Sequence, residues 1–409
     1  MGGQLAATAS IGGRSGAPAG PARPSERLVA IDVLRGLALF GVLAINLDTE
    51  FRVTFFEQFL PPPASAPALD RAVEAFLKIA IEFKAFSLFA FLFGVGLAIQ
   101  FERLAGRSGR ARLLVRRLLF LLAFGLVHLV LIWNGDILTE YAVAGFLVLP
   151  FLFARKRVVV LAAGVALVLY LAMPWLPLPF GFPARGWLAA HAAAARQAYG
   201  HGAFSTILAF RIGEIPDIAR FHVYVLPRTV AMMLLGALAW RTRLLSGAGA
   251  RGKLLGGTAV AAIGLGAILT ALGRRALEPV GVVATPAAVS LAGDLAPVVL
   301  ALGYAALVVW AVTCTRFAPL LAWAAPVGRM AFTNYVMQSL VLGFLFYGYG
   351  LGLMGRLGVA AGLAVAVAFY AAQVGLSAWW LRRCRFGPVE WLWRSLMYGT
   401  RQPWTREAA

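Results

Sequence analysis

The chain has 409 residues, 61% of them hydrophobic, and its mean hydropathy is +0.81. Soluble domains are about 45–50% apolar, so a soluble fold would have to leave much of this excess on its surface. The apolar residues also come in blocks close to the roughly 20 residues that cross a bilayer as a helix. The composition therefore excludes an ordinary soluble domain and predicts an all-α, polytopic integral membrane bundle.

The net charge is +20, from 37 Lys and Arg against 17 Asp and Glu. Because the arginines lie mostly between apolar blocks, they are typical of residues that set membrane topology, and we expect a lipid bilayer and no nucleic acid as partner. Cys314 and Cys384 are expected to be separate structural thiols. The four histidines lack metal-ligand spacing, so we expect neither a metal nor a permanently bound cofactor.

Taken in chain order, residues 1–26 are rich in Gly, Ala, Ser and Pro, which predicts a disordered cytoplasmic tail rather than a cleaved signal peptide. A transmembrane domain of about ten helices is expected over 27–381, and a basic cytoplasmic or interfacial tail over 382–409. The expected spans are 28–47, 83–101, 113–133, 138–154, 158–177, 224–240, 254–272, 291–314, 330–349 and 357–381. Residues 70–82 are amphipathic, which indicates a surface or re-entrant segment.

The connectors between these spans alternate in charge. One set carries 24 basic residues and the other set carries 10. The richer side is expected in the cytoplasm, and an even number of spans then places both termini there. Residues 178–223 become a long extracytoplasmic stretch, which is either a functional loop or a pair of surface helices.

The first span carries Asp32 and Arg35, which lie three residues apart and so share one helix face. Charged side chains inside a span are costly and usually face a partner or a cavity. Arg35 and the preceding Arg27 are candidates for holding the phosphate of a donor from the cytosol, with Asp32 orienting Arg35. A purely structural ion pair is the alternative.

A second polar group is expected at the other end of the bundle. Asn46 ends the first span, Glu82 opens the second, and His128 lies near the end of the third, shortly before Asp136 and Glu140. A histidine with a carboxylate partner suits general-base chemistry near neutral pH. We therefore assign His128 as the candidate base, Asp136 or Glu82 as its orienting carboxylate, and Asn46 as a donor to an oxyanion. Alternatively, His128 is structural and Asp136 only caps the next helix.

Two later segments are also polar. Residues 328–339 include Arg329 and Asn334, which we add to the candidate donor-binding residues, and Gln338 shares a helix face with Asn334. Residues 386–394 mix Trp with charge, which is typical of an anchor at the membrane interface.

These motifs together resemble the YeiB-like family of bacterial membrane proteins. The matching runs are 32–46, 92–94, 128–141, 328–335 and 386–394. That family is similar to a superfamily of transmembrane acyltransferases, which includes the lysosomal heparan-glucosaminide acetyltransferase and bacterial polysaccharide O-acyltransferases and shares the start Asp32-Val-Leu-Arg35-Gly36. The O-acyltransferases have a histidine where this chain has Asn46, so the assignment of His128 as base rests on the present sequence alone.

The resemblance implies a protein of the bacterial inner (cytoplasmic) membrane that transfers an acyl group, with acetyl favoured. The donor would be cytoplasmic acyl-CoA, used as a co-substrate, and the acceptor a hydroxyl or amine on a small molecule, glycan or lipid outside. Two alternatives stay open: a transporter or exporter of a small or amphipathic molecule, and a non-catalytic membrane partner protein.

Overall fold

The computed structural model describes residues 29–61, 65–177, 181, 183–245, 251–276, 278–280 and 284–405. The expected N-terminal tail and Arg27 lie outside this part of the chain. The α-helices are α1 (Val29–Asn46), α2 (Ala68–Phe76), α3 (Lys84–Arg103), α4 (Arg110–Val127), α5 (Ile137–Val148), α6 (Lys156–Ala172), α7 (Arg185–His201), α8 (Phe204–Arg241), α9 (Gly252–Gly273), α10 (Pro286–Cys314), α11 (Ala318–Leu321), α12 (Ala325–Arg329), α13 (Ala331–Phe346), α14 (Val359–Arg383) and α15 (Pro388–Tyr398).

Three helices continue into short π-helical segments. These are η2 (Leu47–Phe51) after α1, η4 (Leu77–Ile81) after α2 and η5 (His128–Ile132) after α4. Such wider turns often occur at functional sites because they redirect side chains that a regular helix would place elsewhere. Two of the three, η2 and η5, lie at the ends of the first and third expected spans, where the sequence places its second polar group.

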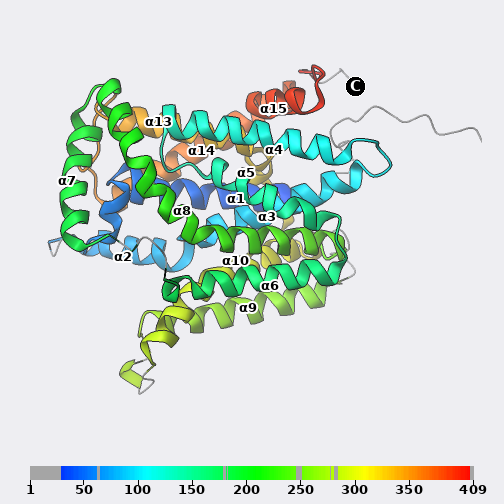
Figure 1. The fold of residues 1–409 in the computed structure, drawn as a ribbon, viewed down its shortest axis with the longest axis horizontal. Helices are drawn as coiled ribbons and strands as arrows, with labels where there is room; N and C mark the ends of the chain where they lie inside the picture. The colour runs from blue at the N-terminus through cyan, green and yellow to red at the C-terminus, as the bar shows by residue number, and fades with distance from the viewer. Residues whose placement is uncertain are drawn as a thin grey trace, which may run out of the picture.

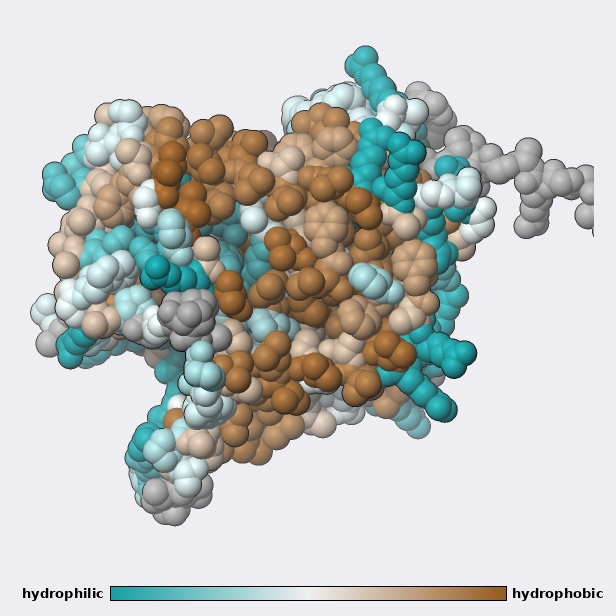
Figure 2. Space-filling view, viewed as in Figure 1, coloured by the Kyte–Doolittle hydropathy of each residue, from teal (hydrophilic) through white to brown (hydrophobic). Residues whose placement is uncertain are grey.

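The all-α polytopic architecture is confirmed. In the described residues, eight helical stretches are long and apolar enough to cross a bilayer, and two shorter apolar helices cover 137–152 and 331–346. These ten stretches correspond to the ten expected spans. Figure 2 shows a broad hydrophobic surface across the middle of the molecule with hydrophilic residues gathered toward both ends, as expected for a protein that is solvated by lipid around its middle.

The bundle has an arginine-rich end and an opposite end. The arginine-rich end holds the start of α1, α4 and α6, the C-terminal ends of α3, α8 and α14, and α15. The opposite end holds η2, α2 and α7, and Figure 1 shows α7 and α15 at different ends of the molecule.

Residues 178–223 contain more helix than a loop would. They include α7 and the first half of α8, which runs without interruption for 38 residues through Pro216 and Pro227. The expected span at 224–240 is thus only the second half of a longer helix. The earlier turns stay helical because two of their charged side chains, Arg211 and Glu214, are buried against the bundle at 0% and 2% exposure.

Glycines allow the closest helix crossings near the cavity described below. A Cβ atom on Gly328 of α12 would lie 1.8 Å from the backbone oxygen of Asp32, and one on Gly36 of α1 would lie 2.1 Å from that of Ala324. Small residues at such crossings let helix backbones approach and pack in a membrane. Helix α12 ends at Arg329, and α13 begins at Ala331 after the single residue Met330. The N-terminus of α13 therefore lies inside the molecule near α1.

Candidate functional site

A cavity of about 780 Å³ lies between α1, α3, α4, α5, α13 and α15. At the arginine-rich end its wall includes more cations than carboxylates. The cations are Arg35, Arg103, Arg117, Arg243, Arg329, Arg385 and Arg394, and the carboxylates are Asp32, Glu102 and Glu390. The mouth of the cavity is therefore positive and suited to an anionic group.

The structure places Asp32 and Arg35 together on this wall. Nη1 of Arg35 lies 3.1 Å from Oδ1 of Asp32, and the two side chains are 27% and 15% exposed. The pairing is the one expected from their spacing on α1. Because Arg35 carries five N–H donors and this contact uses one of its nitrogens, the guanidinium retains donors for a ligand.

Of the two later candidates, Arg329 lines the cavity and Asn334 does not. The Nδ2 atom of Asn334 donates to Oγ of Ser377 at 3.0 Å, and Gln338 donates to Gln373 at 2.8 Å. Both contacts join α13 to α14. The assignment of Asn334 to donor binding is therefore corrected: its side chain is 1% exposed and stabilises a helix interface, because buried amides pair with one another when no ligand reaches them.

Helix α15 forms part of the cavity wall, a role beyond that of an interfacial anchor. Nε1 of Trp393 donates to the backbone oxygen of Arg117 at 3.1 Å, and the Arg117 guanidinium lies 4.1 Å from a ring centroid of Trp393. Glu390 accepts hydrogen bonds from the backbone N–H groups of Phe332 at 2.7 Å and Thr333 at 3.1 Å, and also from the Thr333 hydroxyl. These are N–H groups of the first turn of α13, which a helix leaves unsatisfied, so Glu390 caps α13 from another helix.

The electrostatics of Glu390 reflect two opposing effects. Burial raises the pKa of its carboxyl group, and the hydrogen bonds from Thr333 and Phe332 lower it, with burial the larger effect. A carboxylate at a helix N-terminus is favoured by the helix dipole. The pKa direction shows that removal from water outweighs these favourable contacts.

The inner end of the cavity, farthest from the arginines, is apolar. It is lined by Val42 of α1, by Ile137, Leu138 and Tyr141 of α5, and by Tyr335 of α13. Tyr141 and Tyr335 are 5% and 3% exposed. An anionic ligand with an apolar group would therefore match the cavity in one orientation only.

His128 and Asp136 meet just beyond this inner end. Nδ1 of His128 lies 2.9 Å from Oδ1 of Asp136, and the two side chains are 2% and 0% exposed. The pair is close in distance without the alignment of a hydrogen bond, and Nε2 of His128 has no hydrogen-bond partner in the described residues. Such a buried, unpartnered imidazole nitrogen is available to take a proton from a substrate.

Asp136 also has the structural role that its position suggested. Its carboxylate accepts from the backbone N–H groups of Leu138 at 3.1 Å and Thr139 at 2.7 Å, and so caps α5. The two expected roles, orienting His128 and capping a helix, are therefore compatible in one residue. The cap fixes the carboxylate where it can hold the imidazole.

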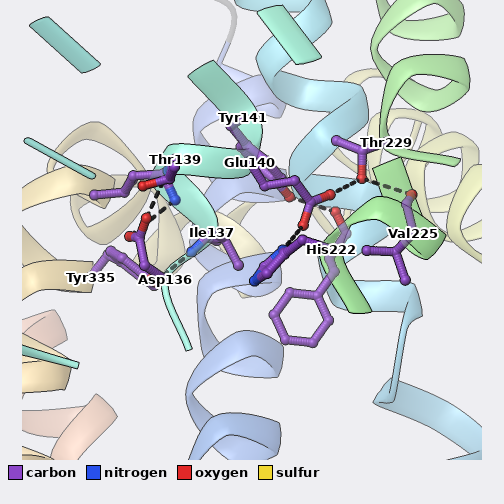
Figure 3. Close-up of polar contacts among 11 residues, drawn as sticks. Asp136, Ile137, Thr139, Glu140, Tyr141, His222, Val225, Thr229 and Tyr335 are labelled. Carbon is purple, nitrogen blue, oxygen red and sulfur yellow. Dashed lines mark hydrogen bonds and ion pairs between the residues drawn. The ribbon is translucent and has the colours of Figure 1, made fainter. Parts of the chain in front are cut away.

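Tyr335 separates His128 from the cavity. Its ring centroid lies 5.2 Å from that of His128, at an interplanar angle of 32°. The same tyrosine lines the cavity, and its hydroxyl accepts a hydrogen bond from the backbone N–H of Ile137 at 3.3 Å. Figure 3 shows Tyr335 beside Asp136 and Ile137 at the start of α5.

Asn46 and Glu82, the two other candidates at this end, have different surroundings. Asn46 is 4% exposed, and its Oδ1 has no hydrogen-bond partner in the described part of the chain. Glu82 has Lys78, Lys84, Arg274 and Asp48 as its charged neighbours. Of the two carboxylates proposed to orient His128, the structure therefore places Asp136 beside it, whereas Glu82 lies among other charged groups.

Two further histidine–carboxylate pairs lie at the opposite end of the bundle. Nδ1 of His222 contacts Oε2 of Glu140 at 2.7 Å, and the Thr229 hydroxyl donates to the same carboxylate, which Figure 3 shows between them. The His222 side chain is 26% exposed. Glu140 lies four residues after Asp136, so this pair is close to the His128–Asp136 pair along the chain, and its histidine is the more exposed of the two.

The other pair is centred on Glu214. Its carboxylate contacts Nε2 of His191 at 2.7 Å and accepts from the Tyr199 hydroxyl at 2.7 Å and from Nδ2 of Asn134 at 2.6 Å. Burial and then the charge of Glu214 hold the pKa of Tyr199 well above its usual value, so the phenol stays protonated and donates. The ring of Trp187 stacks on His191 with a centroid distance of 4.5 Å.

Sequence reasoning missed His191, His222 and Glu214 because it placed them in an extracytoplasmic stretch rather than on helices that pack. The helical spacing of Arg211, Glu214 and Ile218, which are all buried, was the available signal.

Comparison with known proteins gives one consistent relationship. A family described as "Protein of unknown function (DUF418)" matches residues 239–400. The chain is 36% identical to uncharacterized protein YxaH of Bacillus subtilis (strain 168) over 404 residues, which cover 94% of this chain and 97% of that protein. It is 31% identical to uncharacterized protein YeiB of Escherichia coli (strain K12) over 383 residues, covering 91% and 96%. This chain therefore belongs to the YeiB-like family.

Proposed function

We propose that the protein is an acyltransferase of the bacterial cytoplasmic membrane. It would move an acyl group, acetyl first among the candidates, from cytoplasmic acyl-CoA to a hydroxyl or amine of an acceptor on the other side. The observation that carries the proposal is the cavity, which begins among arginines and ends at the tyrosine that packs on the buried His128–Asp136 pair.

The proposed orientation follows from the distribution of charge. The arginine-rich end gathers most of the connectors with Lys and Arg, and cytoplasmic loops carry the excess of these residues. The start of α1 and the whole of α15 lie at this end, so the proposed orientation has both termini in the cytoplasm. Acyl-CoA, which is made and kept in the cytosol, would then reach the arginine-rich mouth directly.

The cavity suits the donor in two respects. Its arginines match the phosphates of CoA, since guanidinium groups bind phosphate through charge-assisted, often bidentate hydrogen bonds. Its inner end, which is apolar, matches the acyl group. With about 780 Å³ the cavity lies within the range of known pockets for small molecules and cofactors.

His128 would act as the general base in the transfer step. Its Nε2 atom accepts the proton of the acceptor hydroxyl, and the acceptor oxygen forms a bond to the thioester carbon. The carbon–sulfur bond then breaks, and the proton passes from His128 to the departing thiolate to give CoA-SH and the acylated product. Asp136 stabilises the protonated imidazole in between. The Tyr335 ring lies between the cavity and the imidazole, so the step requires this ring to turn aside.

Binding of labelled acetyl-CoA to the purified protein in detergent tests the donor site. Wild type should bind saturably, and Arg35→Ala should weaken binding by roughly 10- to 100-fold because it removes charge-assisted hydrogen bonds. Arg316→Ala is the matched control, since Arg316 is exposed at the same end and does not line the cavity. Equal affinity in wild type and Arg35→Ala would contradict the proposal, and solute flux in proteoliposomes without any acyl donor would favour a transporter instead.

A further inference from the structure

The charged part of the cavity wall is confined to one end. On α1 the lining begins at Ile31, and its apolar part extends from the last charged residue, Arg35, to Val42; on α3 the lining extends from Arg103 to Phe89. At 1.5 Å per helical residue, these intervals correspond to roughly 10 Å and roughly 21 Å along the cavity. A ligand held by its anionic group at the mouth therefore points its other end at the apolar inner wall.

Two tyrosine rings close this inner end, and a hydrogen bond holds each of them in place while the donor binds. The Tyr141 hydroxyl donates to the backbone oxygen of Phe86 on α3 at 2.8 Å, and the Tyr335 hydroxyl accepts from the backbone N–H of Ile137 at 3.3 Å. Both rings are at least 95% buried. Because each hydroxyl is satisfied by backbone from another helix or turn, withdrawal of a ring leaves a buried polar group unpaired and costs free energy. The rings therefore limit the space at the binding step, and Tyr335 turns aside only in the transfer step that follows.

We propose that Tyr335 and Tyr141 set the length of the apolar group that the cavity accepts, so that short acyl groups fit and long ones are excluded. The inference rests on the proposed function for the identity of the ligand and adds to it the class of acyl group. A chain too short to reach the rings leaves a void, and one too long meets two fixed aromatic rings in a close-packed interior. Val42, which is fully buried at the same end, narrows the space further.

Competition binding with a series of acyl-CoAs tests this. Acetyl-, butyryl-, octanoyl- and palmitoyl-CoA compete with a labelled short acyl-CoA on wild type, Tyr335→Ala, Tyr335→Phe and Val42→Ala. Wild type should prefer the short members. Tyr335→Ala and Val42→Ala should each raise the relative affinity for the next longer member by roughly tenfold or more, the discrimination that one or two methylenes carry in a packed pocket.

Tyr335→Phe is the matched control, because it keeps the ring that limits the space and loses only the hydroxyl. The ring still packs on His128, with 5.2 Å between the ring centroids, so Tyr335→Phe should keep the preference of wild type. Val42→Ala removes only two methyl groups, so it supplies an answer if Tyr335→Ala does not fold. An unchanged chain-length preference in folded Tyr335→Ala or Val42→Ala overturns the inference and leaves the proposed function standing.

A separate series identifies a failure of the proposed function. If wild type binds no acyl-CoA, the proposed function fails, and alkyl phosphates of the same chain lengths are tested on the same four proteins. A preference for short alkyl phosphates that moves to longer ones in Tyr335→Ala and Val42→Ala supports the length limit for another amphipathic anion. Absence of binding in this series as well overturns the inference.

Discussion

Replacing Glu390 by alanine should destabilise the protein, because this one carboxylate satisfies the first turn of α13 from a different helix. Three donors bind it: the backbone N–H groups of Phe332 and Thr333, and the Thr333 hydroxyl. An N-terminal cap is worth about 0.5–2 kcal/mol, and a hydrogen bond to a charged group about 1.5–3 kcal/mol. Burial outweighs these contacts for the ionised carboxylate, but Glu390→Ala leaves the donors buried without an acceptor. An unsatisfied buried donor costs about 1–3 kcal/mol, so Glu390→Ala should cost about 3 kcal/mol.

Thermal unfolding in detergent measures the effect, and the midpoint should fall by several degrees. Glu278→Ala is the matched control, since Glu278 pairs with Arg275 at an exposed turn and such surface pairs contribute less than about 1 kcal/mol. Thr333→Val should give a smaller loss than Glu390→Ala, because it removes one of the three donors. If Glu390→Ala and Glu278→Ala shift the midpoint equally, then α15 does not hold α13 in the way described.

Three more outcomes follow from the same structure. Burial raises the pKa of Glu390 above the ordinary value of 4.5, so the native chain binds this proton more tightly than the unfolded chain. The resulting stability is fully present below pH 4.5 and is lost as the pH rises through the raised pKa. Unfolding midpoints measured across that range should show this loss in wild type and not in Glu390→Gln. Gly328→Leu should prevent α12 from packing on α1, since its Cβ would lie 1.8 Å from Asp32 O, whereas Gly264→Ala, with open space around it, should leave the yield and the unfolding midpoint unchanged. Asp136→Asn should keep the α5 cap, because Asn caps as well as Asp, yet lower acyl transfer by at least about a hundredfold; transfer and unfolding assays on the same sample would contradict this if both changed together or neither did.

The transmembrane helices could be predicted because their signal is local. Each span is a run of apolar residues of bilayer length, and the run exists whatever the rest of the chain does. The same holds for Asp32 with Arg35, whose spacing alone puts them on one helix face, and for Asp136, whose place before a helix makes it a cap. In these cases the contact lies within one helix turn, so the sequence contains all the information.

Contacts between distant segments could not be predicted in the same way. Glu390 and Thr333 are 57 residues apart, and Asn134 and Glu214 are 80 residues apart, so no spacing links them. Asn334 was misassigned for the same reason: an amide on a helix face can meet a ligand or another amide, and only the packing of α14 against α13 decides between them. The surroundings of Glu82 also depend on distant segments, since its charged neighbours include Asp48 and Arg274.

The distance between the two polar regions limits what the ligand of the cavity can be. Along α4, Arg117 lines the mouth, and His128 lies eleven residues later, which corresponds to roughly 16 Å along the helix axis. That is about half of the hydrocarbon thickness of a bilayer. A small ion bound by the arginines would not reach the imidazole. An elongated amphipathic anion would, with its charge at the mouth and its apolar end against Tyr335.

The closed inner end then favours transfer over transport. A transporter must at some stage open its site to the opposite side and let the whole ligand pass. Here the hydroxyls of Tyr141 and Tyr335 are bound to backbone, and the rings close the cavity against the His128–Asp136 pair. Turning one ring exposes the end of the ligand to His128, while the charged part stays among the arginines. Under the proposed function, this arrangement would pass a group across the membrane without passing the molecule that carried it, as an acyl transfer between two compartments requires.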